Sequence, residues 1–136
     1  MNLECSSKGD RRFSAFYAML KVRSGATKSI ETLYQQSKRM KDGSIAGKGK
    51  RPDYVSIGNE HFTTEALTPW YNYLWFCYFK QNPELLDVIA KYDTFTDMFR
   101  GHCINCQADV IQLVHNKGLK ALADKTDYHT FKLKEI

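Results

Sequence analysis

The sequence lacks the features that mark a membrane-spanning, secreted or disulfide-stabilised protein. It has only four cysteines and three prolines in 136 residues. Its most apolar run, Trp70 to Phe79, is interrupted by Asn72 and is much too short to cross a bilayer. Residues 1–5 contain no basic segment followed by an apolar one, so no secretory signal peptide is predicted. We therefore expect a cytoplasmic protein with reduced cysteines and no membrane association.

Motifs for the common catalytic and cofactor chemistries are also scarce. The four histidines show no HxH or HExxH spacing, and the glycines of residues 42–52 lack the strand, helix and terminal Lys-Ser/Thr of a phosphate loop. Cys103 and Cys106 form a single CxxC after His102, whereas structural zinc usually takes two such pairs. Buried reduced thiols are favoured there, with a metal site or a redox pair as alternatives. No metal or other cofactor is therefore predicted.

Aromatic and basic residues are abundant. Eight Tyr, eight Phe and two Trp suit both a packed core and the flat walls of a base-binding pocket. The 20 Lys and Arg exceed the 15 Asp and Glu, which gives a net charge of +5 and suits a phosphate-bearing partner. Much of the excess lies between Lys38 and Arg51, and residues 40–52 are predicted to be a flexible basic loop. A solvated loop is favoured there, with a loop that faces phosphate or nucleic acid as the alternative.

The apolar periodicity predicts a single domain of residues 1–136 that is mainly α with a minor β component. Ser29 is a predicted helix N-cap, and Thr68-Pro69 is predicted to open a second helix. The expected elements are short strands within 12–22, helices over 30–38, 69–80, 84–92 and 105–122, and a hairpin over 53–62 that turns at Gly58-Asn59.

One helix face has an unusual set of polar groups. Glu31, Tyr34, Gln35 and Lys38 follow one another at i, i+3, i+4 and i+7, so they form one stripe. A carboxylate, a phenol, an amide and an ammonium together could line a hydrogen-bonding pocket. The spacing alone also fits a solvated face, with Glu31 near the positive end of the helix dipole.

Several short elements of the chain, taken in order, resemble the NADAR family. The resemblance covers about residues 13–114. The residues that carry it are Phe13-Ser14-Ala15-Phe16-Tyr17, then Ser29, Glu31, Tyr34, Gln35 and Lys38, then Phe79-Lys80-Gln81-Asn82-Pro83-Glu84-Leu85, and finally Asp97, Gly101 and Asn105.

This resemblance implies a mostly helical fold and metal-independent hydrolysis of a ribose–base N-glycosidic bond. The ligand would be a ribosylated base or an ADP-ribose-like compound, including a modified nucleic acid. Because bond cleavage builds positive charge on the sugar, a carboxylate can steady that charge or activate water. The implied roles are catalysis for Glu31 and Asp97, phosphate or base binding for Arg12 and Lys38, stacking for Phe16 and Tyr34, and hydrogen bonding for Gln35 and Asn105.

Three positions depart from the family pattern: Thr32, Tyr78 and Phe99. They favour a second hypothesis, a non-catalytic protein that sequesters a nucleotide signal derived from ADP-ribose. A third hypothesis is a nucleic-acid-binding module that uses the basic Lys38–Arg51 segment. Its binding would weaken steeply with added salt, because phosphate contacts release counterions.

Overall fold

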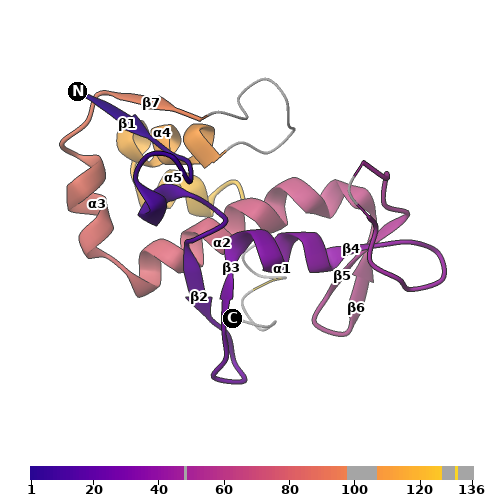
Figure 1. The fold of residues 1–136 in the computed structure, drawn as a ribbon. Helices are drawn as coiled ribbons and strands as arrows, with labels where there is room; N and C mark the ends of the chain where they lie inside the picture. Colours follow the sequence, from indigo (N-terminus) through magenta and orange to yellow (C-terminus); the bar gives the residue numbers. More distant parts are fainter. Residues whose placement is uncertain (48, 98–106, 127–130, 132–136) are drawn as a thin grey trace.

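Helix α2 (Leu67–Gln81) forms the centre of the structure. The computed structural model describes residues 1–47, 49–97, 107–126 and 131. Helix α1 (Ile30–Ser37) packs along α2, as Figure 1 shows. Nearly every side of α2 is buried, and Trp75 and Phe79 are fully enclosed. A helix that is apolar on all sides belongs in the interior, which explains the central position of α2.

Small sheets and short helices surround α2 and α1. The parallel pair β1–β7 lies near α4, and the β2–β3 hairpin and the antiparallel sheet β4–β5–β6 lie elsewhere around α2 (Figure 1). The strands are β1 (Asn2–Glu4), β2 (Met19–Lys21), β3 (Thr27–Ser29), β4 (Lys38–Arg39), β5 (Tyr54–Ile57), β6 (Glu60–Phe62) and β7 (Thr94–Thr96). The remaining helices are η1 (Arg11–Phe13), η2 (Thr64–Ala66), α3 (Glu84–Ile89), α4 (Gln107–Lys117) and α5 (Leu119–Ala123).

Two local predictions are confirmed. The Ser29 side chain accepts a hydrogen bond from the Thr32 main-chain N–H at 3.0 Å, so Ser29 caps α1 as expected. Strands β5 and β6 form the predicted hairpin, with Ile57 opposite Glu60. Gly58 adopts a φ of 59°, a left-handed conformation that explains why a glycine opens this turn.

Several predicted boundaries are wrong. The closing helix is interrupted at Gly118, whose φ of 85° and ψ of 169° no helix allows, so α4 and α5 are separate helices. Within residues 12–22 only Met19–Lys21 is a strand, because Arg11–Phe13 forms a 3-10 turn capped by the Asp10 side chain. Helix α2 begins at Leu67 after the 3-10 turn η2, so Thr68 is not its cap.

The predicted fold class, mainly α with a minor β component, is confirmed only in part. Helices hold more of the described residues than strands do, yet the described part of the chain also forms seven strands in three sheets. The described structure is therefore mixed α and β rather than mainly α. Short strands of two to four residues carry too weak a period-2 pattern for the sequence to reveal them.

The basic segment 40–52 folds back on β4 where it is described. Arg39 and Ile45 form a β-bridge, and the Ala46 N–H donates to the Lys38 carbonyl at 2.9 Å. The Asp53 N–H donates to the Arg39 carbonyl at 2.8 Å, which fixes the end of the segment. Its flexibility in solution stays a prediction. Separately, no helix within the described ranges is long and apolar enough to span a bilayer.

Candidate functional site

Three residues of the predicted stripe lie on α1, and the fourth, Lys38, is the C-cap of α1 and the first residue of β4, so the expected helix was one residue too long. We call Glu31, Tyr34, Gln35 and Lys38 the α1 stripe. The Gln35 Nε2 donates to a Glu31 carboxylate oxygen at 2.9 Å. The Lys38 Nζ lies 4.5 Å from the centre of the Tyr34 ring, a cation–π distance. The Ser29 cap sets this arrangement, because it starts the helix at Ile30 and so places Glu31 in the first turn. Glu31, Gln35 and Lys38 are all partly exposed, as a ligand site requires.

The pKa of Lys38 is lower than that of a lysine in water. Burial of the ammonium group lowers the pKa of Lys38, and the negative charge of Glu31 offsets part of that effect. A lysine with a lowered pKa gives up its proton more readily than a lysine in water. Lys38 is therefore suited to donate a proton or a hydrogen bond to a group that gains electrons.

The Ala15 main chain joins the first turns of two helices that are far apart in sequence. The Glu31 N–H donates to the Ala15 carbonyl at 2.9 Å, and the Ala15 N–H donates to the Gln107 Oε1 at 2.6 Å. Ala15 and Gln107 are both buried. Because buried hydrogen bonds position the groups they join, Gln107 of α4 helps to fix the position of Glu31 through the Ala15 main chain.

Ser14 is a site candidate whose role the sequence reasoning missed. Its hydroxyl is fully buried next to Ala15 and makes no hydrogen bond to the described part of the chain. A buried hydroxyl without a partner costs free energy, so such groups often complete their bonding with a ligand. Its place within the Phe-Ser-x-Phe-Tyr element was the sequence signal.

Asp97, the second predicted carboxylate, follows β7 directly and is only 8% exposed. The Cys5 N–H donates to the Thr96 carbonyl at 2.7 Å, which holds the end of β7 against β1. Strand β7, which Asp97 follows, and the turn η1 both pack on α4 (Figure 1). Asp97 thus follows a strand that packs on α4, whereas Glu31 lies on α1, which packs on α2.

The predicted ligand-binding residues have different surroundings. Arg12 is paired with Asp10 through distances of 3.0 and 2.6 Å, and this pairing raises the pKa of Arg12 and lowers that of Asp10. Phe16 is 49% exposed, which suits stacking. Tyr34 is buried edge-on against Tyr71, with ring centres 5.0 Å apart, and Lys38 covers its ring. A base could stack on Tyr34 only after Lys38 moved.

Asn105, His102, Cys103 and Cys106 lie outside the described residues. Cys77 is a buried free thiol, and burial raises its pKa to about 11, so it is unreactive at neutral pH. Within the described ranges, no group of three or more His, Cys, Asp or Glu side chains is placed to hold a metal ion.

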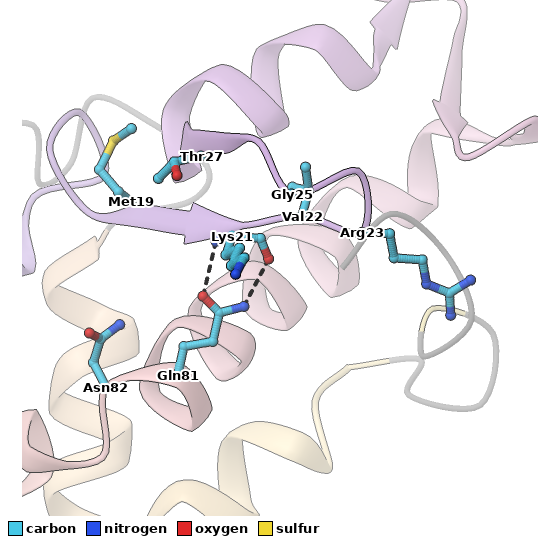
Figure 2. A pocket seen from close by; sticks show the side chains of 8 residues that line it. All are labelled: Met19, Lys21, Val22, Arg23, Gly25, Thr27, Gln81 and Asn82. Carbon is cyan, nitrogen blue, oxygen red and sulfur yellow. Dashed lines mark hydrogen bonds between the residues drawn. The ribbon is translucent and has the colours of Figure 1, made fainter.

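The Gln-Asn-Pro element has a structural explanation. The Gln81 side chain accepts from the Lys21 N–H and donates to the Lys21 carbonyl, both at 3.0 Å, as Figure 2 shows. The Asn82 side chain and main-chain N–H both donate to the Tyr78 carbonyl, which ends α2. Gln81 therefore ties the end of α2 to strand β2, beside an open cleft of about 550 Å³.

Comparison with protein families assigns the chain to a class. A model of the NADAR family matches residues 41–135, which is more than half of the chain, so the chain belongs to this family. The matching model is described as the DarT1-associated NADAR antitoxin. The match includes the Gln-Asn-Pro element and Asp97, and it begins after the α1 stripe. No curated protein matches the chain.

Proposed function

We propose that this protein hydrolyses the N-glycosidic bond between a ribose and a base in an ADP-ribose-like ligand, without a metal ion. The observation that carries the proposal is the α1 stripe. It places a carboxylate, an amide and a lysine of lowered pKa within one partly exposed group. The family membership supports the same ligand class.

The reaction needs one carboxylate and one proton donor. A water molecule attacks C1′ of the ribose, the C1′–N bond breaks, and the bonding electron pair leaves with the base. Glu31 takes a proton from the attacking water and stabilises the positive charge that develops on the sugar. Lys38 gives its proton to the departing nitrogen, which its lowered pKa makes easier. Asp97 is the second carboxylate of the site.

The remaining predicted residues bind the ligand in this proposal. The exposed ring of Phe16 stacks on the base, and the Gln35 amide bonds the sugar hydroxyls on the helix turn next to Glu31. Arg12 binds a phosphate after part of its ion pair with Asp10 is replaced by contacts to the phosphate oxygens. Asn105 bonds the sugar or the base edge. The buried Ser14 hydroxyl joins this group as a further donor or acceptor.

The antitoxin description of the matching family fits two ways of neutralising a toxin. A hydrolase would remove an ADP-ribosyl group from a modified base, whereas a binder would sequester the nucleotide. The departures from the family pattern at Thr32 and Tyr78 favour the binder as the alternative function.

The test is release of free base, followed by mass spectrometry. The substrates are ADP-ribosylated guanine in DNA, NAD, cyclic ADP-ribose isomers and phosphoribosylamino-pyrimidines. Glu31→Gln keeps the volume and the oxygen that accepts from Gln35, so it should fold normally and lose about 10²–10⁴-fold in rate. Glu65→Gln, an exposed carboxylate on η2, is the matched control and should keep wild-type activity.

Three outcomes contradict the proposal. Wild-type turnover by Glu31→Gln would remove Glu31 from catalysis. Loss of activity in a chelator, restored by zinc, would show that a metal is needed. If the protein retains an intact ligand and releases no base, it is a binder, and the departures at Thr32 and Tyr78 become the explanation.

A further inference from the structure

A second cleft, of about 290 Å³, lies on the other flank of α1. It is lined by residues from β3, α1, β4, the basic segment, β5 and α2. Leu33, Gln36 and Ser37 of α1 line this cleft. The 3.6-residue period places them on the other side of the helix from Glu31 and Lys38. The cleft is therefore separate from the proposed catalytic stripe.

The lining of this cleft has positive charge and no carboxylate. Lys28 and Arg39 both line it, together with Gln36 and Ser56. Among the described residues, no Asp or Glu forms an ion pair with Lys28 or Arg39. Since a buried or half-buried cation favours an opposite charge, this lining favours an anion.

Arg39 is already held in a fixed orientation. Its Nε donates to the Gln36 carbonyl at 2.8 Å, and its Nη1 donates to the Gly43 carbonyl at 3.1 Å. These bonds fix the guanidinium plane and leave further N–H groups for a ligand, because arginine has five. A preorganised donor loses little entropy on binding.

Trp70 adds a donor with no acceptor. Trp70 is one of the residues that line the cleft, it is 2% exposed, and its indole Nε1–H has no hydrogen-bond partner in the described part of the chain. A buried N–H without an acceptor costs free energy that an anionic oxygen would recover.

We propose that this cleft binds a phosphate ester through Lys28, Arg39 and the Trp70 indole. Its volume lies just below the range for small-molecule pockets, roughly 300–1,000 Å³, so it takes one phosphate with its sugar rather than a whole dinucleotide. Exposed Lys41, Lys50 and Arg51 follow in the chain and would extend the contact along a polynucleotide strand.

The test is a titration followed by nuclear magnetic resonance, with inorganic phosphate, AMP and a short single-stranded oligonucleotide as three separate probes. The indole N–H signal of Trp70 should shift saturably. The signal of Trp75 is an internal control, because that indole is also buried without an acceptor but does not line the cleft. Equal affinity for AMP and the oligonucleotide would indicate a free nucleotide, and tighter oligonucleotide binding would indicate a strand.

Charge-matched variants complete the test. Lys28→Gln should weaken binding about tenfold and, for the oligonucleotide, reduce the salt slope by roughly 0.7. Lys120→Gln removes the same charge from the exposed face of α5 and should change little. No saturable shift of the Trp70 signal, or equal losses in the two variants, would overturn the proposal. The readout is binding alone, so the result is independent of base hydrolysis.

Discussion

Replacing Gln107 by alanine should damage both stability and the position of Glu31. The Gln107 Oε1 accepts the Ala15 N–H at 2.6 Å, and Ala15 is only 2% exposed. Gln107→Ala leaves this N–H buried without an acceptor. Such a group costs about 1–3 kcal/mol, so we expect a loss of about 2 kcal/mol in the free energy of unfolding.

That loss corresponds to a measurable change in melting temperature. The entropy of unfolding is about 2.1 cal/mol/K per residue, or roughly 0.29 kcal/mol/K for a chain of this length. A loss of about 2 kcal/mol therefore lowers Tm by about 7 °C. The assays are calorimetry and urea unfolding of Gln107→Ala. Lys117→Ala, an exposed position at the other end of α4, is the control and should stay within about 0.5 kcal/mol of wild type.

The same variant tests the coupling of α4 to the proposed catalytic stripe. The Ala15 carbonyl accepts the Glu31 N–H, so loosening Ala15 should displace Glu31 and lower kcat more than it changes KM. Unchanged stability in Gln107→Ala would refute the hydrogen-bond reasoning. A stability loss with wild-type kcat would refute the coupling and leave Gln107 a purely structural residue.

Two further predictions concern pH and the backbone. Burial raises the pKa of Tyr78 to about 12, above its usual 10.0, so the unfolded state loses this proton first and stability should fall as pH rises from about 10 to 12. Tyr78→Phe should flatten that fall, and it should cost about 1 kcal/mol at pH 8 because the hydrogen bond to the Arg12 carbonyl is lost. Tyr17→Phe, at an exposed position, should do neither. Urea unfolding across this pH range measures both effects, and an unchanged fall in the stability of Tyr78→Phe at alkaline pH would contradict the prediction. Gly118→Ala should cost about 2 kcal/mol in thermal unfolding, because its φ of 85° and ψ of 169° are nearly exclusive to glycine. Gly47→Ala, which has ordinary φ and only a 4.0 Å neighbour, should be nearly neutral, and equal effects of the two would refute the backbone argument.

Features set by neighbouring residues were predictable from the sequence. The Ser29 cap, helix α1 and the Gly58 turn depend on hydrogen bonds and dihedral angles within a few residues. For the same reason the α1 stripe was predictable as a group, since helical spacing alone places Glu31 beside Gln35.

Features set by distant residues were not predictable. Nothing in the local sequence indicates that Gln107 bonds Ala15, or that Lys38 covers the Tyr34 ring. The basic segment was predicted from its charge, but the Arg39–Ile45 bridge that folds it back needs a partner strand. These contacts depend on packing around α2, which a pattern of period 2 or 3.6 does not encode.

The parallel pairing of β1 with β7 has a consequence for how the protein is made. Asn2 pairs with Thr94, so the strand at the start of the chain has no partner until more than 90 residues have been synthesised. The entropic cost of closing a loop rises with its length, and parallel long-range pairing is intrinsically slow. The emerging chain can build the β2–β3 hairpin and α1 first, and β1 can pair only after β7 has been synthesised. Slower translation of the residues between β1 and β7 should therefore prolong the time during which Leu3 and Cys5 are accessible to chaperones. Both residues are buried in the finished fold.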